Sequence, residues 1–412
     1  MNVSFSRATA LLTVAGALAL PAAATTSTET LIDTALLSMQ QAPASWAEAF
    51  AQGQGSIAFN YRFEEVDQTG FAKNAHASTL RTAVGFKTAA YQGFQGFIQF
   101  EDISIVGNEH AFTTANRPTV ADFRTTDLNQ AFIDYSSDMG LFRLGRQEVI
   151  FDNARFVGNV GWRQNHQSFD ALAWVAPDDF PVDATFAYVN NVNTITGANL
   201  RTDTYLLNVS KDFEDIGKLT VYGYSLDVHA APALSTLTIG ARFVGNMDMG
   251  DAGGIDYTGE FANQSDTADN TTLDADYYHF ELGGEMSGVR LGIGQELLGS
   301  DGGAVGFSTP LATLHGQNGW ADKFLGTPAN GLEDTYISVG GKVSDVKLAA
   351  IYHDFAADEG GADYGTELDL VAKYKVNAQT MVGLKYADYS ADTFATDTQK
   401  IWFWVTWTPF AK

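Results

Sequence analysis

Charged side chains recur at every second position of several short, otherwise apolar segments, and they are the first candidates for chemistry in this sequence. Arg62 and Glu64, for example, alternate with Tyr61 and Phe63. The candidates are the charged residues at these alternate positions and the arginines of the segment 150–167. They are Arg62, Arg81, Glu101, Asp134, Arg143, Arg155, Arg163, Asp170, Arg290 and Glu296. Charges that line a water-filled passage select solutes electrostatically. We therefore predict a pore lining with a constriction, where no bond is made or broken.

The segment 150–167 has two interpretations, which are not exclusive. If it folds inward, it narrows the passage and brings Arg155 and Arg163 beside the solute. Its arginines could instead pair with carboxylates and pin the segment to a wall. The sharper hypothesis is that Arg143 and Arg163 act with Asp134 and Glu101 at or near the narrowest point.

A second long polar segment, 299–331, carries side chains that stack on sugars and hydrogen-bond to them. These are Trp320, Asp322, Lys323 and Phe324. A lid that packs over a channel mouth is the favoured interpretation, since functional and merely structural loops share this composition.

Acidic residues late in the chain are candidates for Ca²⁺ binding through their oxygens. They are Asp354, Asp358, Glu359, Asp363 and Glu367. Their spacing is not that of an EF-hand loop, so a solvated surface loop is favoured and no other cofactor is predicted. The chain also lacks a G-x-S-x-G elbow and an H-E-x-x-H zinc motif, and we predict that it is not an enzyme.

The elements that position these residues are strands, because the apolar residues have a period of two. The predicted segments number about 18, each long enough for a tilted membrane strand. They lie near 55–65, 77–89, 93–104, 126–136, 140–149, 168–176, 182–190, 202–213, 217–227, 233–245, 254–263, 276–287, 288–298, 332–343, 345–355, 363–376, 379–390 and 398–410.

The connections between these segments alternate in length. Those after odd-numbered segments include the long ones, 105–125, 150–167 and 299–331, whereas those after even-numbered segments are mostly tight turns such as Ser344-Asp345. Long loops on one side and short turns on the other are typical of outer-membrane β-barrels. We therefore predict an all-β fold, a closed antiparallel transmembrane barrel with lipid on its apolar face.

Aromatic residues near strand ends are predicted to form girdles at the two membrane interfaces. The set includes Tyr61, Phe63, Tyr277, Tyr278, Tyr386, Tyr389, Trp402, Phe403, Trp404 and Trp407. Any one of them could instead be an ordinary core residue.

The amino-terminal residues differ from the rest. Arg7, an apolar run over 8–20 and small residues ending at Ala24 predict a secretory signal peptide over 1–24. Residues 25–54 are predicted to be a periplasmic segment with short helices over 31–39 and 46–50, and 55–412 to be the barrel. The formal charge of −25 disfavours nucleic acid as a partner, and the absence of Cys excludes a thiolate site.

Several motifs resemble those of the alginate-export family of outer-membrane barrels, in particular its porin-like members. They include Leu144-Gly-Arg-Gln-Glu148, Arg155-Phe-Val-Gly-Asn159, Thr309-Pro-Leu-Ala-Thr-Leu-His315 and Asn318-Gly-Trp-Ala-Asp-Lys-Phe324. The resemblance implies an 18-stranded barrel with a hydrophilic pore. The mixed charges of the predicted lining depart from the Arg-rich pore of the family's dedicated alginate exporter.

These observations together predict an outer-membrane porin of a Gram-negative cell, through which small hydrophilic solutes diffuse passively. The alternative is a channel for export or uptake of an acidic polysaccharide or oligosaccharide such as alginate. A structural or adhesive barrel without conduction is a third class. The partners expected of such a protein are outer-membrane lipids, lipopolysaccharide and the barrel-assembly machinery.

Overall fold

A closed antiparallel barrel dominates the computed structural model, which describes residues 42–110, 116–214, 216–250, 253–267 and 273–410. The predicted signal peptide over 1–24 and the predicted helix over 31–39 lie outside the described residues. In the described part, no helix is long and apolar enough to cross a membrane.

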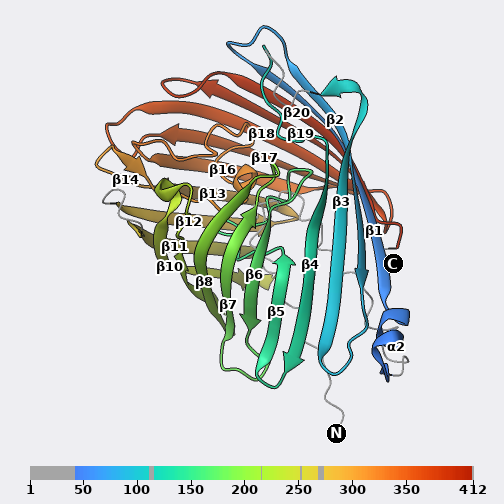
Figure 1. The fold of residues 1–412 in the computed structure, drawn as a ribbon. Helices are drawn as coiled ribbons and strands as arrows, with labels where there is room; N and C mark the ends of the chain where they lie inside the picture. Colours follow the sequence, from blue (N-terminus) through green and yellow to red (C-terminus); the bar gives the residue numbers. More distant parts are fainter. Residues whose placement is uncertain (1–41, 111–115, 215, 251–252, 268–272, 411–412) are drawn as a thin grey trace.

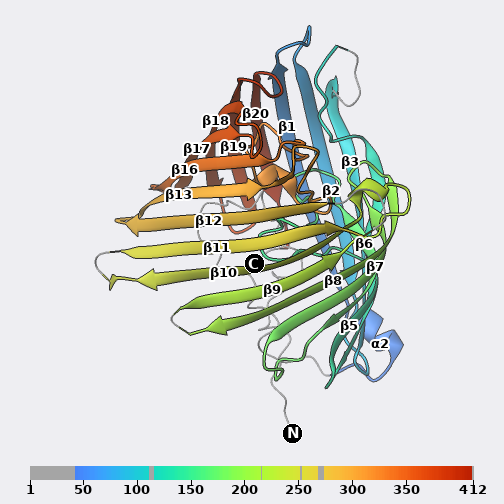
Figure 2. The same cartoon turned by 90° about the vertical axis from the view of Figure 1, so that its left-hand side faces the viewer.

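Each barrel strand is hydrogen-bonded to two neighbours, and β1 pairs with both β2 and β20, which closes the sheet (Figures 1 and 2). The prediction of an 18-stranded barrel is confirmed. The strands are β1 (Gln54–Gln68), β2 (Ala75–Lys87), β3 (Phe94–His110), β4 (Thr125–Ser137), β5 (Gly140–Gln147), β6 (Ser168–Val175), β7 (Asp183–Asn193), β8 (Asn199–Phe213), β9 (Gly217–Ser225), β10 (Thr236–Asp248), β11 (Gly254–Asp266), β12 (Asp274–Met286), β13 (Val289–Leu298), β16 (Leu332–Val343), β17 (Val346–Ala356), β18 (Asp363–Lys375), β19 (Thr380–Ala391) and β20 (Thr398–Trp407).

The two faces of the sheet differ in polarity. Large apolar side chains project outward and are exposed, among them Ile133, Leu144 and Ile337. The residues between them face the barrel interior, as Arg62 and Glu64 do, and are buried there. A closed sheet has no partner sheet for its apolar outer face, so hydrocarbon is the solvent that suits it, and closure leaves no unpaired strand edge.

The connections follow the predicted alternation. Short turns such as 138–139, 287–288 and 344–345 follow even-numbered barrel strands, and the long loops 148–167 and 299–331 follow odd-numbered ones. The second long loop holds the small hairpin of β14 (Ser300–Asp301) and β15 (Val305–Gly306) and the 3₁₀ turn η3 (Leu314–Gly316). A further 3₁₀ turn, η1 (Pro232–Leu234), follows β9.

A short helix, α2 (Trp46–Ala51), precedes the barrel, as predicted for 46–50. Ser45 caps it by accepting a hydrogen bond from the Glu48 amide at 3.2 Å. The helix lies beside the outer wall, next to the turn between β2 and β3 (Figure 1).

An apolar core lies inside the barrel, which the sequence pattern did not predict. Trp402, Trp404, Tyr277 and Tyr389 are fully buried in it and face the interior. The prediction that these four belong to interface girdles was therefore wrong. They pack there because the two long loops fold inward and bring their own apolar residues, such as Trp162, Trp320 and Phe324, into the barrel.

Candidate functional site

Two long loops meet inside the barrel and form the candidate site. We call residues 148–167 the β5–β6 loop and residues 299–331 the β13–β16 loop. Val157 and Leu311 form a parallel bridge between them, and the Gly158 amide donates to the Leu311 carbonyl at 2.9 Å. A Cβ on Gly158 would lie 2.2 Å from the Thr313 hydroxyl oxygen, so only glycine permits this approach.

An aromatic and cationic cluster lies under the junction of the two loops. Trp162 of the first loop stacks on His315 of the second, with ring centroids 4.4 Å apart. The Lys385 ammonium from β19 lies 4.2 Å from the Trp162 ring centroid and 3.7 Å from that of Trp320, and it is 2.8 Å from His315 Nε2. A cation between aromatic faces is stabilised by their quadrupoles. Lys385 therefore joins both loops to the barrel wall.

Asp322 is the electrostatic centre of the β13–β16 loop. Its carboxylate accepts from Arg163 at 2.9 Å, from Lys400 of β20 at 2.7 Å and from His315 Nδ1 at 2.7 Å. Burial alone would raise the pKa of Asp322, but His315, Lys400 and Arg163 hold it well below its usual value. Burial also lowers the pKa of His315 well below its ordinary value, against the opposing effect of Asp322. The loop thus carries a charged carboxylate between two cations.

Arg62 and Glu64 of β1 hold the first loop to the same part of the wall, because β1 pairs with β20. Arg62 donates to the Trp162 carbonyl, and its guanidinium lies 4.4 Å from the Trp162 ring centroid. Glu64 accepts from Arg163 at 3.0 Å. Both interpretations of this loop therefore hold together: the β5–β6 loop folds into the interior, and ion pairs fix it to the wall.

The start and end of the β5–β6 loop are held together by Glu148. Its carboxylate is 2.9 Å from His166 Nδ1 and accepts from Asn129 and Asn159, each at 2.7 Å. Burial raises the pKa of Glu148, but His166 and the hydrogen bonds outweigh it and bring the pKa to about 2. Next to it, the Glu101 carboxylate accepts from the His166 amide at 3.0 Å and pairs with Arg81 at 2.6 Å.

Arg155 links the β5–β6 loop to β13 of the barrel wall. Its guanidinium is 2.7 Å from Glu296 of β13 and donates to the Asn318 side chain at 3.2 Å. Asn318 in turn donates to Glu296 at 2.6 Å and to Asp334 at 3.1 Å. Both predicted residues of this pair, Arg155 and Glu296, are thus brought together by the structure.

Other predicted residues form ion pairs between strands of the barrel wall, and one member of each pair is partly exposed to solvent. Arg143 pairs with Asp134 through two hydrogen bonds of 2.7 and 2.9 Å and keeps 19% of its side chain exposed. Arg290 pairs with Asp256 and Glu281, which keep 18% and 15% exposed. Gly283 and Gly292 leave room for the Arg290 guanidinium.

The placement of Asp170 in the pore lining is contradicted. Asp170 shares the outward face of β6 with the exposed Leu172, and its carboxylate pairs with Arg146 at 2.7 Å. Its neighbour Phe169 points inward instead and is fully buried against the apolar core of the loops. The usual alternation of lipid-facing apolar and lumen-facing polar residues is inverted here because the loops place apolar side chains inside the barrel.

The hypothesised grouping at the narrowest point is also divided by the structure. Arg143 and Asp134 lie together, but Arg163 pairs with Glu64 and Asp322, while Glu101 pairs with Arg81. Lys385 and Lys400 were not among the predicted site residues. Both lie at inward-facing positions of strands that the sequence did predict. The alternation of inward and outward residues was therefore the sequence signal that could have identified them.

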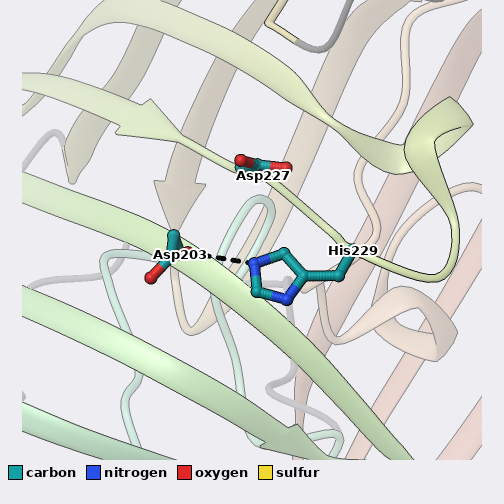
Figure 3. A group of neighbouring side chains, drawn as sticks. All are labelled: Asp203, Asp227 and His229. Carbon is teal, nitrogen blue, oxygen red and sulfur yellow. Dashed lines mark hydrogen bonds and ion pairs between the residues drawn. The ribbon is translucent and has the colours of Figure 1, made fainter.

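A different group of side chains lies together at the start of β8 and after β9 (Figure 3), where Asp203 shares the outward face of β8 with the exposed Tyr205. Asp203, Asp227 and His229 offer ligand atoms within 4.8 Å of one another. Asp203 already accepts hydrogen bonds from Tyr188 and from His229 Nε2, the second at 2.9 Å. In the described part of the chain this is the group with the spacing of a metal site.

The acidic residues predicted to bind Ca²⁺ do not converge. Asp354 is exposed on the outward face of β17, whereas Glu367 faces the interior of β18 and accepts from the Ala321 amide at 2.7 Å. Calcium binding by this part of the chain stays a prediction.

Comparisons with known proteins agree with this architecture. A family model described as alginate export matches residues 53–292. The solved structure of OccAB2 from Acinetobacter baumannii is 15% identical, with a TM-score of 0.67 over 86% of this chain and 98% of that chain. OccK9 (OpdG) of Pseudomonas aeruginosa is 10% identical, with a TM-score of 0.70 over 87% and 99%. OpdK of the same species, solved with vanillate, is 11% identical, with a TM-score of 0.68 over 87% and 99%. A search of curated protein sequences gives no match.

Proposed function

The chain belongs to the alginate-export family, and we propose that it forms a passive outer-membrane channel for small hydrophilic solutes. The observation that carries this proposal is the pair of inward loops, which are joined to each other at Val157 and Leu311 and fixed to the wall by buried ion pairs. Such an arrangement would narrow a wide barrel with its own loops, where a plugged barrel would use a separate domain.

Membrane insertion follows from the outer surface. Exposed Ile, Leu, Phe and Val side chains cover the outward faces of strands all around the barrel, including Ile133, Leu172, Ile239, Leu291 and Ile337. In water this surface would cost free energy in proportion to its apolar area, whereas in hydrocarbon it is stabilising. With short turns on the periplasmic side, the two long loops enter from the extracellular side. Lipopolysaccharide and the barrel-assembly machinery are the partners that this location implies.

Solutes of limited size suit the interior better than a polymer does. The loops fill part of the barrel with an apolar core, whereas the charged side chains of Arg143, Asp256 and Glu281 keep 19%, 18% and 15% of their surface exposed. At about 18 strands the remainder of the interior is wide enough for water. Charges of both signs along it give selectivity by local field rather than by net charge. No cofactor or energy source is needed for diffusion.

Planar-bilayer recording tests the proposal and separates it from transport of an acidic polysaccharide. Purified protein should give a steady current that alginate oligomers do not block. Block at low oligomer concentration would replace the small-solute channel with a polysaccharide channel. Absence of any current would contradict both kinds of channel and favour a structural barrel.

A further inference from the structure

We propose that α2 is an interfacial anchor whose Trp46–Phe50 face lies in the periplasmic leaflet of the membrane, at the lower edge of the barrel's apolar outer surface. The inference rests on the proposed function, because it requires that the barrel spans the outer membrane. The partner is lipid, and the contact surface is a pair of aromatic rings on one side of a short helix.

The helix is fixed to the outside of the wall. The Phe50 ring stacks on Phe86 of β2 with ring centroids 6.4 Å apart and planes 9° apart. Trp46 meets Tyr91 edge-on at 5.1 Å and lies 6.1 Å from Phe94 of β3. Phe86 and Phe94 belong to the outward faces of their strands, so α2 lies beside the barrel and not within it (Figures 1 and 2).

The junction between α2 and β1 gives the helix a fixed position. A Cβ on Gly53 would lie 2.2 Å from the Phe86 ring and 2.9 Å from the Lys87 carbonyl oxygen. Only glycine allows the chain to pass so close to the wall. The Ala89 amide donates to the Ala49 carbonyl at 3.0 Å, which ties the helix to the turn between β2 and β3.

The contacts with the wall leave about half of each aromatic ring of the helix exposed. Trp46 is 51% exposed and Phe50 is 60% exposed. Their spacing of four residues places them on one face, while Glu48 lies on the opposite face. Aromatic side chains on one face and a charge on the other are typical of helices that lie in a membrane interface.

Lipid is favoured over a protein partner because the aromatic face is continuous with the lipid-facing surface. Phe94, Ile98 and Phe100 extend it along β3, with 37%, 39% and 49% of each residue exposed. A helix of six residues also offers far less area than a stable protein interface requires. The tight turns mark this end as periplasmic, which assigns the contact to the inner of the two leaflets.

Depth-dependent fluorescence quenching tests the anchor, and the chain is suited to it because it contains no Cys. Four single-cysteine variants, Trp46→Cys, Phe50→Cys, Ala51→Cys and Ile133→Cys, are labelled with an environment-sensitive NBD fluorophore. Each full-length protein is reconstituted into phosphatidylcholine vesicles with and without a lipid that carries a nitroxide near its headgroup. Ile133 reports on insertion of the barrel, and Ala51 on the helix face turned away from Trp46.

The anchor predicts that the labels at 46 and 50 lose at least half as much fluorescence to the nitroxide lipid as the label at 133, whereas the label at 51 is quenched by aqueous iodide instead. Labels at 46 and 50 that respond to iodide as strongly as that at 51 would overturn the anchor while the barrel remains inserted. Labels at 46 and 50 that neither quencher reaches would also overturn the anchor, because protein and not lipid would then cover α2. An unquenched label at 133 would refute the membrane location, and the anchor with it.

Discussion

The indole ring of Trp162 and the imidazole ring of His315 stack with their planes 9° apart, although they belong to two different loops. Trp402 and Trp404 of β20 contact the Trp162 ring edge-on, at 5.8 and 5.7 Å between centroids. The two loops therefore share one core inside the barrel. A change in either loop should therefore loosen both.

Asp322→Asn should release the β13–β16 loop, because Arg163 and Lys400 lose a charged partner while they remain buried. Breaking a buried ion pair costs about 3–5 kcal/mol. Single-channel recordings should show a larger and noisier current, with the folded barrel still migrating as a compact band in unheated gels. Asp345→Asn is the matched control, since this carboxylate is 73% exposed in its pair with Lys342. Identical currents for Asp322→Asn and wild type would contradict the prediction.

Gly158→Ala should separate the two loops without changing any charge. The added Cβ would lie 2.2 Å from the Thr313 hydroxyl oxygen and 2.8 Å from the Ala154 Cβ. Strain of this kind in a packed core typically costs about 1–3 kcal/mol. Limited proteolysis of the protein in detergent should cleave the variant within 148–167 faster than wild type. Gly70→Ala serves as the control, because a Cβ there meets nothing within 4 Å, although its positive φ adds some local strain. Equal cleavage rates for Gly158→Ala and wild type would exclude the tight contact.

The barrel could be predicted from the sequence because strand periodicity and loop parity are local properties. The position of Phe169 and Asp170 could not, since their faces depend on residues far away in the chain. The rule that apolar residues meet lipid holds for Leu144 and Ile133, which lie clear of the loops. It fails at Phe169 and Trp402 because the inward loops provide a second apolar environment.

The partners of the predicted arginines show the same limit. The alternation of strand residues identified Arg62 and Arg143 as inward-facing, and both are. It could not identify Asp322 as a partner of Arg163, since a loop has no periodicity from which its side chains can be placed. Pairing between two loops requires knowledge of how both fold.

Acid should loosen the β5–β6 loop through Glu148. The pKa of this carboxyl is about 2 in the folded protein against an ordinary 4.5. Because the folded pKa is lowered, the docked loop gains about 3 kcal/mol at pH values above 4.5, and loses it as the pH falls through 2. Channel current should therefore rise between pH 4 and 2 in the wild type. Glu148→Gln should lack this step, and an identical pH profile in the two proteins would be evidence against the role of Glu148.

Ion selectivity should respond to the pair of Arg143 and Asp134, in which the Arg143 side chain keeps 19% of its surface exposed. Arg143→Gln leaves the Asp134 carboxylate without its bidentate partner, so the reversal potential in a salt gradient should shift toward cation preference. The double variant with Asp134→Asn restores neutrality and should return the reversal potential toward the wild-type value. A shift that persists in the double variant would indicate a structural rather than an electrostatic cause.

We propose that the inward loops set the width of a conducting channel. The most direct test is the single-channel conductance of a variant in which residues 150–165 are replaced by a short Gly-Ser linker. We expect a conductance larger than that of the wild type, with the barrel still folded and inserted. Equal conductance in the two proteins would contradict it, because the β5–β6 loop could then not be what narrows the channel.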